Sequence, residues 1–260
     1  MKPTSHLAAS RRSVLAAAMS AMVLAACGGN DGIDDRTGTA DPKVRLVHAI
    51  PAAPNLDLFR DGNNQVAEAT NVPYKGASVY FGVSANNHAF DVRTNTTPAV
   101  GVGSAQFDAH RGNKYTLIAV PDAGSVTTVA LIDDPFERGL TSDNAHVRAF
   151  NAAFNTPSFD VYLTAANVDY RNVSATLPAV AYKAAVPASG MNSIEVEGGA
   201  YTLRLTAPNT KTVLFTAPVT LDKNADWLIV PVPNSVTAGD MHVLVVQADN
   251  GPAQELTNQP

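Results

Sequence analysis

An arginine and an aspartate recur together in two stretches of the chain. The first stretch reads VRLVHAIPAAPNLDLF from Val44, and the second reads VRAFNAAFNTPSFDVY from Val147. Arg45 and Asp57 therefore reappear 103 residues later as Arg148 and Asp160. Such a pair could grip a charged ligand, or it could bridge two antiparallel strands on their outer face and contribute about 0.2–1 kcal/mol. Because both copies carry the pair, we interpret it as a structural ion pair of the scaffold.

Motifs for catalysis or metal binding are not found. The histidines have neither HxH nor HExxH spacing, and the single cysteine cannot complete a zinc site with them. Gly101-Val102-Gly103-Ser104-Ala105 lacks the last glycine of a GxSxG nucleophile turn. His48 follows the alternation of Val44 and Leu46, which predicts an inward-facing, hydrogen-bonded core residue. We therefore expect no catalytic residue, no metal and no cofactor, and we expect that the protein is not an enzyme.

The single cysteine lies where acylation would occur. Cys27 follows a basic N-terminus and an apolar run of small residues, SVLAAAMSAMVLAA, which is typical of an export signal and too short for a membrane-spanning helix. The four residues that end the run resemble the lipobox of bacterial lipoproteins, which implies cleavage before Cys27 and acylation of its thiol. The residues that carry this interpretation are Arg11, Arg12, Leu24, Ala25, Ala26 and Cys27. Residues 10–15 also resemble a twin-arginine signal, and general secretion remains the alternative.

The segment after the signal predicts a tether. Residues 28–42 read GGNDGIDDRTGTADP, a composition too polar to bury a core, so we expect residues 27–42 to be a disordered link from lipid to folded domain. Gly28 stands where lipoproteins of the inner membrane often carry aspartate, so the resemblance implies the outer membrane. The expected location is the cell envelope, facing the periplasm or the cell surface, with membrane lipid as one partner through Cys27.

Composition limits the other partners. The chain is 45% apolar and 16% charged, with a formal net charge of −5 and no basic run after the signal. A packed core is therefore available, and nucleic acid is excluded as an expected partner.

Alternation with a period of two predicts β-strands. In Phe159–Leu163 and in Tyr201–Leu205, every second residue is apolar, as in a strand with one buried face. Tyr74-Lys75 corresponds to Tyr182-Lys183, and Val92-Arg93 to Leu203-Arg204. The matches therefore extend along each copy, and a period of about 103 residues has the size of a domain. We predict an all-β chain with two tandem immunoglobulin-like antiparallel β-sandwich domains, at residues 43–140 and 141–252, and a tail at 253–260.

This pattern also resembles a known family. The stretches VRLVHAIPAAPNLDLFRDG, VPYKGASVYFGV and KYTLIAV are similar to the DUF4397 domain of bacterial envelope proteins, and the second copy is a divergent version in which Asn151 replaces His48. The resemblance implies extracellular β domains, often in tandem and often lipid-anchored. We expect a non-catalytic module for binding, adhesion or envelope structure, with an unknown envelope or extracellular ligand. The alternatives are an envelope hydrolase that acts on glycans at the interface of the two domains, and an assembly subunit that pairs through edge strands.

Overall fold

The protein is built almost entirely of β-strands. The computed structural model describes residues 37–122, 127–135, 141–247 and 253–259, and the only helices within them are short 3₁₀ turns such as η1 (Ala67–Ala69) and η3 (Tyr170–Asn172). The predicted all-β sandwich class is confirmed. The signal and lipobox, with Arg11, Arg12 and Cys27, lie outside the described residues.

Eight strands form the first sandwich. They are β1 (Lys43–His48), β2 (Leu56–Arg60), β3 (Asn64–Gln65), β4 (Phe81–Gly82), β5 (Asn87–Thr94), β6 (Gly101–Asp108), β7 (Asn113–Pro121) and β8 (Thr127–Pro135). One sheet has the order β3-β2-β5-β6 and the other the order β4-β1-β7-β8.

Ten strands form the second sandwich. They are β9 (Asn144–Phe150), β10 (Ser158–Thr164), β11 (Leu177–Ala181), β12 (Ala185–Val186), β13 (Ile194–Glu197), β14 (Gly199–Thr206), β15 (Val213–Leu221), β16 (Asp226–Pro233), β17 (Met241–Gln247) and β18 (Gln254–Leu256). One sheet has the order β11-β10-β14-β15, and the other the order β12-β9-β16-β17-β18, with β13 also paired to β9. The residues expected to form a C-terminal tail therefore supply strand β18, which pairs with β17.

The two sandwiches share one topology, and it contains a parallel pair that the antiparallel prediction lacked. Strand β1 runs parallel to β7, with Val44 opposite Tyr115, and β9 runs parallel to β16, with Val147 opposite Trp227. In both halves the chain leaves the first strand for the other sheet and returns to the partner strand later. The sequence repeat thus corresponds to a structural repeat.

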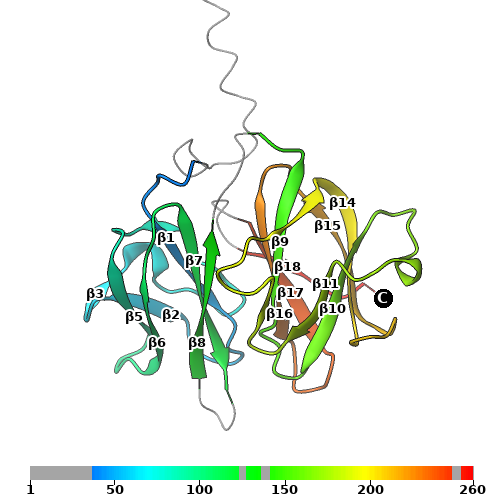
Figure 1. Cartoon of the computed structure of the whole chain (residues 1–260). Helices are drawn as coiled ribbons and strands as arrows, with labels where there is room; N and C mark the ends of the chain where they lie inside the picture. The colour runs from blue at the N-terminus through cyan, green and yellow to red at the C-terminus, as the bar shows by residue number, and fades with distance from the viewer. Residues whose placement is uncertain (1–36, 123–126, 136–140, 248–252, 260) are drawn as a thin grey trace, which may run out of the picture.

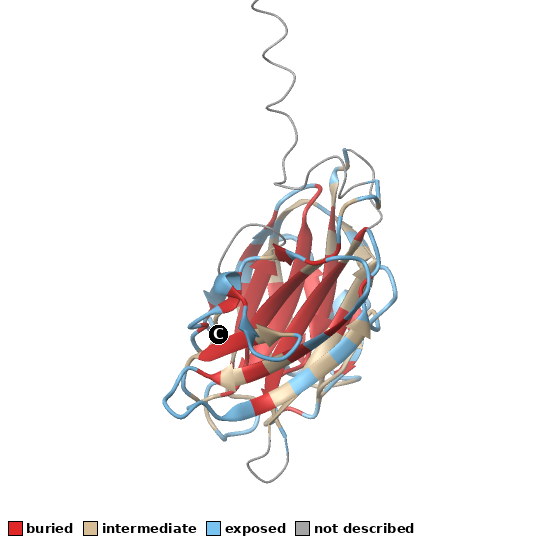
Figure 2. Ribbon diagram, turned by 90° about the vertical axis from the view of Figure 1, so that its left-hand side faces the viewer, coloured by how far each residue is buried: buried red, intermediate tan, exposed pale blue. Residues whose placement is uncertain are grey.

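The four sheets stack as layers, with one sheet of each sandwich facing the other sandwich (Figure 1). Each sandwich encloses its own apolar core, and a third apolar cluster fills the space between the two inner sheets. That cluster includes Ile118 and Val120 from β7 and Val230 and Val232 from β16. Inner strands such as β7 and β16 are therefore buried on both faces, whereas the outer strands β5 and β15 alternate. Figure 2 shows the difference as continuous red strands inside and mixed colours outside.

Candidate binding site

The two recurring arginines lie between the sandwiches. The Arg45 side chain donates from Nε to Thr116 Oγ1 at 3.0 Å and from Nη1 to the Gln247 carbonyl of the second sandwich at 3.4 Å. Its guanidinium carbon lies 4.5 Å from the centre of the Tyr80 ring. Arg45 thus connects β1 to the last long strand of the other sandwich.

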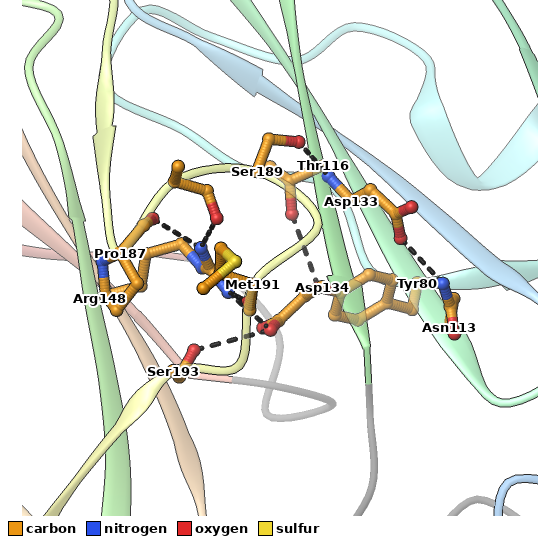
Figure 3. A network of polar contacts seen from close by, with 11 residues as sticks. Tyr80, Asn113, Thr116, Asp133, Asp134, Arg148, Pro187, Ser189, Met191 and Ser193 are labelled. Carbon is orange, nitrogen blue, oxygen red and sulfur yellow. Dashed lines mark hydrogen bonds and ion pairs between the residues drawn. The ribbon is translucent and has the colours of Figure 1, made fainter.

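Arg148 belongs to the second sandwich and also bridges to the first, through the contacts shown in Figure 3. Its side chain is buried, with 1% of the residue exposed. Its Nη2 donates to Asp134 Oδ1 of the first sandwich at 2.9 Å and to the Met191 carbonyl. Its Nη1 donates to the carbonyls of Pro187 and Ala188. One buried cation therefore fixes loop 187–191 of its own sandwich and a carboxylate of the other.

The predicted ion pairs between these arginines and the recurring aspartates are wrong. Strands β1 and β2 lie in different sheets, as do β9 and β10, so each arginine and its aspartate belong to opposite layers of a sandwich. Asp57 accepts hydrogen bonds from the backbone N–H of Asn71 and from the side chain of Asn95.

Asp160 has the same role as Asp57 in the second sandwich. Its two carboxylate oxygens accept from the backbone N–H groups of Ala179 and Asn209 at 2.7 and 3.0 Å. Both aspartates are scaffold residues, as expected, but they brace loops instead of neutralising the arginines.

Two equivalent Tyr-Lys turns also join the sandwiches. The Tyr74 hydroxyl donates to the Pro233 carbonyl, and the Tyr182 hydroxyl donates to the Pro121 carbonyl. Lys75 reaches Glu255 Oε1 at 2.7 Å, and Lys183 reaches Asp122 Oδ1 at 2.7 Å. Burial raises the pKa of both tyrosines to about 12, so the hydroxyls stay protonated donors at neutral pH.

One cavity between the sandwiches is small. It has a volume of about 10 Å³ and is lined by charged and aromatic side chains that include Arg45, Lys114, Asp134, Arg148 and Trp227. That volume suits about one water molecule. A glycan chain would require the sandwiches to separate.

His48 is the buried core residue that the alternation predicted. It is 0% exposed, and its Nδ1 accepts from the Ile50 N–H, which leaves Nε2 to donate to the Pro54 carbonyl. Desolvation lowers its pKa to about 4, so the ring is neutral at physiological pH. Asn151 repeats these contacts, since its amide donates to Thr156 and accepts from Ala153. Within the described part of the chain, no three His, Cys, Asp or Glu side chains gather as a metal site.

Two open hollows lie on the second sandwich beside η3. One is lined mainly by β14 and β15 and has a volume of about 690 Å³, and the other, beside the loops around η3 and 207–211, has a volume of about 740 Å³. Arg171 lines both. These volumes fall within the range of about 300–1,000 Å³ that is usual for ligand sites.

A tyrosine positions two guanidinium groups at the first hollow. Tyr170 is buried, and its ring centre lies 5.4 Å from the Arg171 guanidinium carbon and 4.8 Å from that of Arg204. Lys211 donates to the Tyr170 carbonyl, the Val173 carbonyl and the Tyr162 hydroxyl, which fixes η3 to the sheet. The Arg171 side chain is 67% exposed, and its nearest acid is Asp169 at 3.9 Å.

Neither of these arginines was predicted as a binding residue. Matching Val92-Arg93 with Leu203-Arg204 hid the charge reversal at Arg204, because strand register gives a different correspondence. Phe59 pairs with Asp91, and its counterpart Tyr162 pairs with Arg204. Asp91 therefore corresponds to Arg204, and by the 103-residue offset Glu68 in η1 corresponds to Arg171. The first sandwich carries acids at the two positions where the second carries arginines.

Comparison with known proteins finds one family. Residues 42–162 match the family described as "Domain of unknown function (DUF4397)", so a DUF4397 domain covers the first sandwich, strand β9 and most of β10. No curated protein matches the chain. Within the described residues, no helix has the length and apolar character needed to cross a membrane.

Proposed function

We propose, with the DUF4397 domain at residues 42–162 as the premise, that the protein is a non-catalytic binding module of the cell envelope. Its second sandwich is a divergent copy of the first, which the shared topology and the reciprocal Tyr-Lys contacts support. Export and acylation at Cys27 attach the module to membrane lipid, with the outer membrane as the expected site.

One observation supports binding above all others. The two large hollows open on the second sandwich, at positions where the copies differ in charge, whereas the contacts between sandwiches recur in both copies. We interpret the contacts that occur in both sandwiches as parts of the scaffold. The arginine-lined hollows occur on the second sandwich, and they are available for a specific ligand. The alternative hydrolase would need a glycan-sized cleft between the sandwiches, and the cavity at Arg45 and Arg148 has a volume of about 10 Å³.

Co-sedimentation tests the binding function. The full-length acylated protein, purified in detergent, is mixed with envelope fragments from cells that lack it, and saturable binding is expected. Ser174→Trp fills the second hollow at an exposed position, and it should weaken binding. Ser104→Trp places the same bulk on an exposed site of β6 in the first sandwich and should leave binding unchanged. Absence of saturable binding would refute the proposal.

Mass spectrometry of the protein from native cells tests the anchor. The expected N-terminal residue is Cys27 with two or three acyl chains, because one chain alone holds a protein only marginally on a membrane. A major species that retains residues 1–26, or a free thiol at Cys27, would contradict the expected attachment.

A further inference from the structure

We propose that the two hollows of the second sandwich bind a polysaccharide that carries carboxylate groups, with Arg171 and Arg204 as its charge contacts. This inference rests on the binding function proposed above and names the class of ligand.

Charge is the first argument. The chain has a formal net charge of −5, yet both charged side chains among the described residues that line the first hollow are arginines. Guanidinium groups bind carboxylates through paired hydrogen bonds, and Arg204 uses one bond, from Nη1 to Thr164 Oγ1 at 2.9 Å. The site therefore has cationic donors available for an anionic ligand.

Preorganisation is the second argument. The Tyr170 ring packs against both guanidinium groups, and η3 is held by Asp169, whose Oδ1 accepts from the Arg171 N–H at 3.0 Å. Arginine side chains supported in this way lose less freedom when they engage a ligand. The rest of the wall offers neutral groups that match sugar hydroxyls, namely Thr202, Thr216 and Asn258.

The arrangement of the hollows favours a polymer. Arg171 lines both of them, so a ligand that contacts Arg171 has room to continue on either side. Val213 borders one hollow and Val173 the other, and both are partly exposed, at 39% and 38%. These apolar edges fit the less polar faces of sugar rings.

The first sandwich provides an internal contrast. Its outer sheet has the same strand order as the sheet that carries the site, but Glu68 and Asp91 occupy the positions of Arg171 and Arg204. Carboxylates at those positions would repel an anionic chain. The proposal thus assigns binding to one sandwich only.

Binding of polygalacturonate to the full-length protein in detergent tests the inference, with dextran as the neutral polymer. We expect saturable binding of polygalacturonate that weakens with salt, and no binding of dextran. The double variant Arg171→Gln with Arg204→Gln should weaken binding at least tenfold. The single variant Arg171→Lys should lose less affinity than Arg171→Gln. The control Arg111→Gln changes the net charge at a 62% exposed arginine of the first sandwich and should have no effect.

The other outcomes overturn the inference. They are no binding of any carboxylated polysaccharide, equal binding by the double variant, and a preference for inorganic phosphate or for phosphatidylglycerol vesicles. If envelope fragments still bind in those cases, the proposed binding function survives and only the ligand class is wrong.

Discussion

Tyr74 and Tyr182 form reciprocal contacts: each donates its phenolic hydrogen bond to a proline carbonyl at the end of a strand in the other sandwich. The acceptors, Pro233 and Pro121, end the equivalent strands β16 and β7. The two halves therefore meet with approximate twofold symmetry inside a single chain.

Removing either hydroxyl should destabilise the protein by a similar amount. Tyr74→Phe and Tyr182→Phe each delete one hydrogen bond between the sandwiches, and we expect each to lower the free energy of unfolding by about 1 kcal/mol. Urea denaturation measures the change. The control is Tyr201→Phe, whose hydroxyl donates to Glu197 within its own sandwich at an exposed site and should matter less. Unequal losses at Tyr74 and Tyr182 would argue against equivalent roles.

Stability should fall in alkali because of the same tyrosines. Burial raises the pKa of both to about 12 from an ordinary value of 10.0, so the unfolded chain releases these protons before the folded one does. Their contribution is complete below pH 10 and is lost as the pH rises to about 12. Thermal unfolding between pH 9 and 12 should show this loss, and a variant with both tyrosines changed to phenylalanine should show less of it. If the stability of that variant falls with pH as steeply as that of the parent protein, the assignment is refuted.

His48 should limit stability in acid. Its pKa is lowered by burial to about 4 from 6.5, so the unfolded chain takes up a proton that the folded protein excludes. The stabilisation is present above pH 6.5 and is lost as the pH falls towards 4. His48→Asn copies the residue that the second sandwich uses at this position, Asn151. We expect that variant to fold and to lose less stability between pH 6.5 and 4, as monitored by denaturation at each pH; equal acid sensitivity would contradict the assignment.

Arg148 should contribute more to stability than Arg45. Arg148→Met removes the guanidinium group that donates to Asp134 and to three loop carbonyls, and we expect the free energy of unfolding to fall by roughly 3–5 kcal/mol, as for other broken buried pairs. Arg45→Met removes two longer hydrogen bonds and should lower the free energy of unfolding by a smaller amount. Arg111→Met, at an exposed site, should stay within about 0.5 kcal/mol of the parent protein. A smaller loss for Arg148→Met than for Arg45→Met would overturn this ranking.

Much of the fold could be predicted from the sequence. Period-two alternation at Phe159–Leu163 and Tyr201–Leu205 predicted strands, and both segments lie in outer-sheet strands, β10 and β14. The single buried face predicted for Phe159–Leu163 is wrong, because β10 is buried from Phe159 to Thr164. The same rule failed at Arg45 and Arg148. It assumes that one face of a strand meets solvent, whereas β1 and β9 bury both faces, one in a sandwich core and the other between sandwiches.

The candidate site could not be predicted in the same way. Arg171 and Arg204 are 33 residues apart and come together only because η3 lies over β14. The charge reversal of Arg204 relative to Asp91 becomes visible only through strand register, since loop lengths differ between the copies. The 103-residue offset already placed Arg171 opposite Glu68, and that was the available signal.

The third apolar cluster has a consequence for how the protein behaves at low abundance. In an ordinary dimer the matching faces find each other by diffusion, so the assembly comes apart on dilution. Here the complementary face is carried on the same polypeptide, at an effective local concentration that dilution does not change. A single molecule therefore has the same paired architecture at any concentration.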